Sequence, residues 1–130
     1  MPTSAELLQR AREAQTKAYA PYSKYKVGAA ILTASGEIFT GANVENMSFG
    51  ATICAERSAI IAMVMAGHRE IIAVAIVTPD GGYPCGICLQ SLREFIIAPD
   101  ECKIVVPLEN GLVEKTFREL APNLWSSPLV

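Results

Sequence analysis

Apolar residues near the start of the chain recur at the spacing of one helix face. The members of this pattern are Leu7, Leu8, Ala11, Ala14 and Ala18. Thr3, followed three residues later by Glu6, matches a capping box, in which each residue satisfies a backbone donor of the other. The pattern therefore predicts an amphipathic helix near residues 4–19, which Pro21 closes.

Five shorter segments have the composition of β-strands. Residues 26–34 and 37–44 are separated by a short Ser-Gly turn and predict an antiparallel hairpin. Residues 70–78 form a continuous apolar run, as expected of a strand that is covered on both faces. Residues 103–108 and 112–115 flank an Asn-Gly turn and predict the last two strands.

Three further helices complete the pattern. Residues 53–66 are almost entirely apolar and precede Gly67, a typical C-terminal cap, so they predict one helix. Residues 86–97 predict a second helix. Thr116 and Glu119 repeat the capping-box pattern and predict the start of a short third one. The order α-β-β-α-β-α-β-β-α predicts an α/β fold of three layers, with a mixed sheet of about five strands and helices on both faces. We expect one domain over residues 1–130. The apolar helix at 53–66 has little polar surface, so we also expect it to be buried in an oligomer.

Composition limits the partners of this chain. Of its 130 residues 51% are hydrophobic, and the formal charge is only -2, so no surplus of basic residues is available to bind a nucleic acid polymer. No apolar run is long enough to cross a membrane, and the start has the pattern of an amphipathic helix rather than of a signal peptide. We therefore expect a cytoplasmic protein, in which the cysteines stay reduced.

Cys85 and Cys88 form a C-x-x-C pair at the start of a predicted helix. Such a pair suits a redox dithiol, a disulfide or half of a metal site. Cys54 stands at the start of another predicted helix, so three thiolates can converge on one Zn²⁺ and leave its fourth position open, as in catalytic sites. Cys102 is the available fourth ligand for a purely structural site, but it lacks a partner motif and is interpreted as a small buried apolar residue.

The segment Cys54-Ala55-Glu56 adds a carboxylate two residues from a thiol. In zinc deaminases a cysteine or histidine precedes such a glutamate by two residues, a P-C-x-x-C motif follows, and the glutamate carries protons without binding the metal. An ordinary salt bridge is the alternative role for Glu56. Its position beside three cysteines favours proton transfer.

The chain resembles the cytidine deaminase family, specifically its small, all-cysteine, homotetrameric branch. The resemblance extends over most of the chain, through YAPYSKYKVGAAILTASGEIFTGANVEN, TICAERSAI, PCGICLQSLREF and the final RELAP. It implies hydrolytic deamination of cytidine and 2'-deoxycytidine in pyrimidine salvage, with Zn²⁺ held by Cys54, Cys85 and Cys88. Glu56 would then be the catalytic proton carrier.

The resemblance also implies roles for residues around the substrate. Asn43 and Glu45 match residues that bind the ribose hydroxyls, although from the sequence alone they are equally well explained as turn residues that close the hairpin. Tyr25 matches an aromatic residue, usually Phe, that packs near the base. The remaining implied residues are Ala55 as a substrate contact, Phe49 as an aromatic that reaches a neighbouring subunit's site, and Arg57 as a moderator of the negative charge of the zinc site.

Three positions depart from the family pattern. Leu89 replaces an Arg that follows the last cysteine of the motif, a DGGY segment precedes Pro84, and Trp125 lies in a tail where relatives often have Phe. Two alternative functions share the same motifs: a deaminase of a cytosine-containing antibiotic such as blasticidin S, or of a modified cytidine, and an inactive zinc-stabilised binding domain. The Asn43–Asn46 segment favours ordinary nucleosides, and an intact Glu56 argues against inactivity.

Overall fold

The computed structural model describes residues 1–127 and contains the nine expected helices and strands in the expected order. The helices and strands are α1 (Ser4–Gln15), β1 (Gly28–Thr33), β2 (Ile38–Ala42), α2 (Ala55–Met65), β3 (Ile71–Val77), α3 (Gly86–Arg93), β4 (Lys103–Leu108), β5 (Gly111–Thr116) and α4 (Phe117–Leu120). A short 3-10 helix, η1 (Phe49–Ala51), lies between β2 and α2. Both predicted capping boxes, at α1 and at α4, are formed. Within residues 1–127 we find no helix with the length and apolar character needed to span a membrane.

The strands form one mixed sheet in the order β2-β1-β3-β4-β5. β1 pairs antiparallel with both β2 and β3, and β4 pairs antiparallel with β5. β3 and β4 are parallel, so α3 is the helix of a β-α-β crossover. The predicted five-stranded mixed sheet is therefore confirmed.

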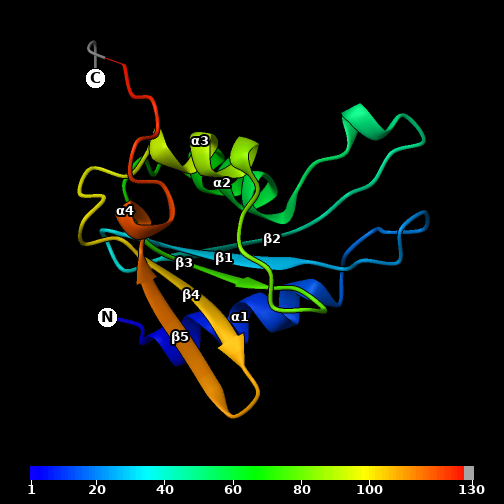
Figure 1. Ribbon diagram of the computed structural model, residues 1–130, viewed down its shortest axis with the longest axis horizontal. Coiled ribbons are helices and arrows are strands. Elements are labelled where there is room, and N and C mark those ends of the chain that lie inside the picture. The colour runs from blue at the N-terminus through cyan, green and yellow to red at the C-terminus, as the bar shows by residue number, and fades with distance from the viewer. Residues whose placement is uncertain (128–130) are drawn as a thin grey trace.

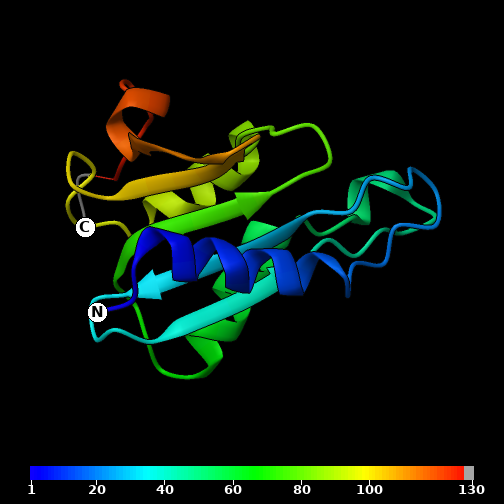
Figure 2. The same ribbon diagram turned by 90° about the horizontal axis from the view of Figure 1, so that it is seen from below.

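Helices cover both faces of the sheet, as Figures 1 and 2 show. Alternating side chains of β1 contribute to both layers: Ala30 and Leu32 pack with α1, whereas Ala29 and Ile31 pack in the core on the α2 and α3 side. The buried face of α1 contains Leu7, Leu8, Ala11 and Ala14. The three-layer prediction is confirmed.

Two glycines let helices approach the sheet closely. A Cβ atom at Gly28 would lie 2.0 Å from the Ala11 carbonyl oxygen of α1, and one at Gly41 would lie 2.4 Å from the Ala59 nitrogen of α2. Neither position leaves room for a larger residue without movement of the helix. Gly41 in this way sets the distance between β2 and the helix that begins after Cys54.

Element ends differ from the predictions in several places. The first helix stops at Gln15 rather than near residue 19, because Tyr19 leaves the helical path and forms a bridge with Val44. The third helix stops at Arg93 rather than at residue 97, since the Phe95 carbonyl instead accepts a hydrogen bond from the Ile71 amide. β1 and β2 are both shorter at their ends than residues 26–34 and 37–44.

The helix predicted to be buried, now α2, is buried on one side only within a single chain. Ala55, Glu56, Ala59, Ile60 and Met63 face inward. Ile61 is 54% exposed and Met65 is 81% exposed on its outer side. The outer apolar surface of α2 is therefore uncovered in one chain.

Candidate functional site

Three cysteine side chains meet where two helices begin. Cys54 is the N-cap residue of α2, Cys85 is the N-cap residue of α3, and Cys88 lies in the first turn of α3. Their sulfur atoms all lie within 4.8 Å of one another. Cys88 is buried, Cys54 is half-buried and Cys85 is exposed. The structure thus brings together the three thiols that the sequence predicts as metal ligands.

The surroundings of these thiols favour a negatively charged sulfur. A hydrogen bond with Cys88, assisted by Arg57, lowers the pKa of Cys54 to about 5. The same hydrogen bond, together with burial, raises the pKa of Cys88, because the proton of the pair resides there. Unpaired backbone N–H groups at both helix starts add positive potential. Three converging soft donors of this kind fit Zn²⁺, with Cys54, Cys85 and Cys88 as the residues that would hold it.

Cys102 has a different environment. It lies in the core on the α2 and α3 side and is 2% exposed, and burial raises the pKa of its thiol to about 12. Among the described residues it is not part of the three-thiol group. The interpretation of Cys102 as a small buried apolar residue is confirmed, and a structural site with four cysteines is excluded by this geometry.

Glu56 and Arg57 flank the thiols on the first turn of α2. Glu56 is only 4% exposed; burial raises the pKa of its carboxyl group, and the nearby Cys54 sulfur adds to this effect. The Arg57 Nη2 group donates to the Cys54 sulfur at 3.6 Å and to the Thr52 carbonyl at 3.2 Å. A carboxyl group that stays protonated more readily than usual therefore lies beside the thiols, and a guanidinium group offsets their negative charge.

Asn43 and Glu45 follow β2 and hold the loop between α1 and β1. The Asn43 side chain accepts from the Val27 amide at 2.8 Å and donates to the Tyr25 carbonyl at 2.8 Å. Glu45 accepts from the amides of Tyr22 and Ser23 and from the Ser23 hydroxyl. The hydrogen bond from Ser23 is the main cause of a lowered Glu45 pKa. Both residues thus have a structural role, although they hold the loop between α1 and β1 rather than close the hairpin.

The other predicted substrate residues lie at different depths. Ala55 is fully buried at the first position of α2. Tyr25 is 38% exposed, and its hydroxyl group donates to Asp80 at 2.6 Å. Phe49 is 78% exposed on η1, where its ring forms an edge contact with Tyr22. η1 lies on the long loop that projects from the end of the sheet, together with the loop after α1 (Figure 1).

The departures from the family pattern also have defined positions. Leu89 is half-buried and packs against the core on the α2 and α3 side. Trp125 is 68% exposed, and its carbonyl accepts from the Gln90 side chain at 3.1 Å. Residues 128–130 of the tail lie outside the described residues.

Thr78 and Asp80 are site neighbours that the sequence analysis missed. Asp80 accepts from both the Tyr25 and the Thr78 hydroxyl groups, on the loop that leads from β3 to Cys85. The unusual DGGY segment marked this loop as different, but no spacing rule links residue 25 to residue 80. Only the folded chain brings them together.

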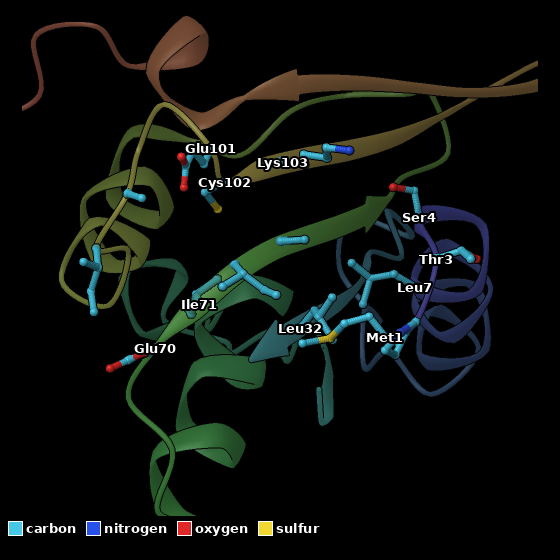
Figure 3. Close-up of a pocket in the computed structure, with 15 residues that line it drawn as sticks. Met1, Thr3, Ser4, Leu7, Leu32, Glu70, Ile71, Glu101, Cys102 and Lys103 are labelled. Atoms are coloured by element: carbon cyan, nitrogen blue, oxygen red, sulfur yellow. The ribbon is translucent and has the colours of Figure 1, made fainter. Parts of the chain in front are cut away.

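A cavity of about 520 Å³ lies elsewhere, between the start of α1 and the first residues of β3 and β4 (Figure 3). Leu7, Leu32, Ile71 and Cys102 contribute to its wall. It contains none of the predicted metal or substrate residues. This cavity is therefore separate from the three-thiol site.

Comparison with known proteins agrees with this site. Residues 1–102 match the cytidine and deoxycytidylate deaminase zinc-binding region. The chain is 38% identical to a cytidine deaminase from Halalkalibacterium halodurans, over 93% of this chain and 92% of that protein. It is also 39% identical to a probable cytidine deaminase from Dictyostelium discoideum, with 92% and 81% of the two chains covered.

Solved structures give the same result. A cytidine deaminase from Burkholderia pseudomallei superposes with a TM-score of 0.85 at 37% identity, covering 96% of this chain and all of that one. A cytidine deaminase from Mycobacterium tuberculosis has a TM-score of 0.83 at 32% identity, with 98% and 100% covered. Fold and site together define the class of zinc-dependent nucleoside deaminases. Within that class, the chain belongs to the cytidine and deoxycytidylate deaminase family.

Proposed function

We propose that this protein hydrolyses cytidine and 2'-deoxycytidine to uridine and 2'-deoxyuridine, with release of ammonia. The observation that carries the proposal is the position of Glu56: a buried carboxyl group on the first turn of the helix that Cys54 caps, beside the converging thiols. A zinc site that only stabilised the fold would not need such a group. The wide coverage of cytidine deaminase relatives supports the same substrate class.

Glu56 is the proposed proton carrier. When bound, Zn²⁺ supplies a Lewis acid that makes a water molecule more acidic. Glu56 takes a proton from water and passes it to N3 of the cytosine ring as the hydroxide oxygen adds to C4. Glu56 then takes the proton of the new C4 hydroxyl group and delivers it to the amino group, so that the C4–N bond breaks, ammonia leaves and C4 keeps a carbonyl oxygen. The raised pKa of the buried carboxyl group suits this exchange, because a weaker acid holds the proton more readily between the two transfers.

Arg57 is proposed to moderate the charge of the thiols. Three thiolates and one divalent cation together leave about one negative charge, which opposes ionisation of water. The hydrogen bond from Arg57 Nη2 to Cys54 withdraws part of that charge. Arg57 thus acts on the reaction through the sulfur ligand.

Asn43 and Glu45 are proposed to bind the sugar while they keep their structural hydrogen bonds. The Asn43 amide uses one acceptor and one donor position on the backbone, so one further N–H and one lone pair are available. An ionised carboxylate has about four acceptor positions, and Glu45 uses three. Both groups therefore retain capacity for a sugar hydroxyl.

The remaining substrate contacts are proposed from the family resemblance. Tyr25 places its ring near the base, and Ala55 offers the backbone N–H of a first helical turn, which has no partner within its own helix. Phe49 completes a neighbouring subunit's site. Its exposure on the projecting loop supports a role outside its own chain.

A homotetramer is the proposed assembly. Ile53, Ile60, Ile61 and Phe95 line a groove of about 430 Å³ between α2 and α3, and Met65 extends the apolar surface along α2. A second copy of this chain is the proposed occupant, since contact between like apolar faces gives closed symmetric oligomers.

The proposed location is the cytoplasm, which the four free cysteines support, because reducing conditions there keep thiols free. The proposed reaction suits pyrimidine salvage. A single catalytic domain over residues 1–130 is proposed to perform it.

Purified protein with its zinc content measured should be tested against cytidine, 2'-deoxycytidine, cytosine and blasticidin S, following ammonia release. We expect turnover of both nucleosides and no turnover of the antibiotic. Turnover of free cytosine should be low, because the base lacks the sugar that Asn43 and Glu45 are proposed to bind. A zinc-loaded protein that deaminates none of the four would overturn the proposal. Preference for blasticidin S would instead support the alternative substrate.

A further inference from the structure

The Tyr25 side chain connects two loops that are far apart in the sequence. Its hydroxyl group donates to the Asp80 carboxylate at 2.6 Å, and the Thr78 hydroxyl donates to the same oxygen at 3.1 Å. Asp80 belongs to the loop that runs from the end of β3 to Cys85. The Phe that the family resemblance leads us to expect at position 25 could not form this bond.

The loop from Thr78 to Cys85, called the metal-ligand loop below, is folded around this contact. The Gly82 amide donates to the Thr78 hydroxyl at 2.7 Å. A Cβ atom at Gly82 would lie 3.5 Å from both the Tyr25 hydroxyl oxygen and the Asp80 carboxylate oxygen. The turn that precedes Cys85 therefore packs directly against the Tyr25 hydroxyl group.

The backbone of Tyr25 is held from the other side by the proposed sugar-binding residues. Its carbonyl accepts from the Asn43 side chain at 2.8 Å, and its amide donates to the Ser23 hydroxyl at 3.0 Å. The Ser23 hydroxyl in turn donates to Glu45. Hydrogen bonds thus connect Asn43 and Glu45 through Tyr25 to the loop that ends at Cys85.

We propose that Tyr25 and Asp80 form a positioning pair that couples sugar binding to the metal-ligand loop. The hydroxyl-carboxylate bond fixes the loop after α1 against the Thr78–Gly82 turn, which sets where Asn43 and Glu45 hold the nucleoside relative to Cys85. Asp80 acts through its hydrogen bonds with Tyr25 and Thr78, so it is a positioning residue and not a catalytic one. The inference rests on the proposed deaminase function and adds a specific pair of residues to it.

Kinetics of Tyr25→Phe, Asp80→Ala and the double variant test this pair. Tyr25→Phe should raise KM for cytidine about three- to tenfold, as expected for the net contribution of one hydrogen bond at an exposed position, and Asp80→Ala should raise KM at least as much; kcat should change less than KM in both. The double variant should be no worse than Asp80→Ala, because Asp80→Ala already removes the bond that Tyr25→Phe removes. Tyr83→Phe, an exposed tyrosine in the same loop, is the matched control and should leave KM unchanged.

Zinc content and amide exchange separate positioning from a purely structural effect. Zinc content should equal that of the wild type in all four variants. In the wild type, added uridine should slow amide hydrogen exchange in residues 79–84, and this slowing should be lost in Tyr25→Phe. An unchanged KM in Tyr25→Phe, additive effects in the double variant, or slowing by uridine that survives in Tyr25→Phe would each overturn the proposal.

The same experiments distinguish failure of this inference from failure of the proposed function. If the wild type does not deaminate cytidine, the proposed function fails, and the exchange experiment without nucleoside still reports on the pair. In that experiment Tyr25→Phe should speed exchange in residues 79–84 relative to Tyr83→Phe. If the wild type is active and Tyr25→Phe behaves like it in every measurement, only the pair is wrong.

Discussion

Among single residues, burial distinguishes Glu56 from the other carboxylates near the site. Glu56 is 4% exposed, whereas Asp80 is exposed and Glu45 is half-buried. Exposed carboxylates remain ionised near neutral pH, but a buried one keeps its proton more easily. This difference in burial supports the proposal that Glu56 carries the proton during the reaction.

Replacing Glu56 by Gln removes the ionisable group and keeps the side-chain shape. We expect turnover of cytidine to fall by about 10²- to 10⁴-fold, the usual contribution of a positioned acid-base group. Zinc content should stay the same, because the three sulfur ligands are unchanged. Glu109→Gln, at an exposed position in the turn after β4, is the control and should keep the activity of the wild type. Near-normal activity in zinc-loaded Glu56→Gln would exclude Glu56 as the proton carrier.

The Tyr25 phenol gives a direct pH measurement of its bond with Asp80. That hydrogen bond raises the pKa of Tyr25 above the ordinary value of 10.0. Its contribution to the free energy of unfolding is therefore fully present below pH 10 and is lost as pH rises through the raised pKa. Phenolate absorbance should show that Tyr25→Phe removes one of four tyrosine transitions, and that the missing one lies above pH 10. A missing transition at or below pH 10 would contradict the bond.

Residue-level prediction succeeded where function dictates spacing. Cys54, Cys85 and Cys88 were predicted as one cluster, because a P-C-x-x-C pair and a C-x-E segment at helix starts are characteristic of one kind of chemistry. Asp80 could not be predicted, since its partner Tyr25 comes from another loop. The sequence allows a structural role for Asn43, but only the fold shows that its amide pairs with backbone groups of residues 25 and 27.

Among secondary-structure elements, types were predictable and ends were not. Ala18 continues the helical spacing of α1, yet the helix ends at Gln15, because the Tyr19 amide donates to the Asn43 carbonyl and the Tyr19 carbonyl accepts from the Glu45 amide. The capping boxes at Thr3 and Thr116 were predicted correctly because all their contacts are local. Contacts between distant segments therefore decide the boundaries that the local pattern misplaces.

Gly41 offers a test of how β2 positions α2. In Gly41→Ala the new Cβ atom would lie 2.4 Å from the Ala59 nitrogen and 2.5 Å from the Ala55 carbonyl oxygen, so α2 must move. We expect denaturant unfolding to show a loss of about 1–3 kcal/mol, with weaker zinc binding because Cys54 moves with the helix. Gly111→Ala, where a Cβ atom would meet nothing within 4 Å, should change neither quantity. Equal stability of the two variants would mean that the sheet adapts without moving α2.

For the whole molecule, the uncovered apolar side of α2 leads to a prediction about assembly. Light scattering should give the wild type a mass near that of four 13.9 kDa chains. Ile61→Glu should give smaller species, because it places a charge on the apolar surface, and should lose activity if Phe49 serves a neighbour's site. Leu108→Glu, which is 57% exposed at the turn between β4 and β5, is the control and should keep the mass of the wild type. A wild type that has the mass of one chain would refute the assembly.

The order of strands also has a consequence for how the protein acquires its metal. β3 lies between β1 and β4 in the sheet, and along the chain it separates the helix that Cys54 caps from the helix that Cys85 caps. We expect a chain whose β3 is not yet in place to offer Zn²⁺ only the neighbouring pair Cys85 and Cys88, which binds more weakly than three thiols. During refolding, the appearance of tight zinc binding should mark the moment at which the central strand takes its place.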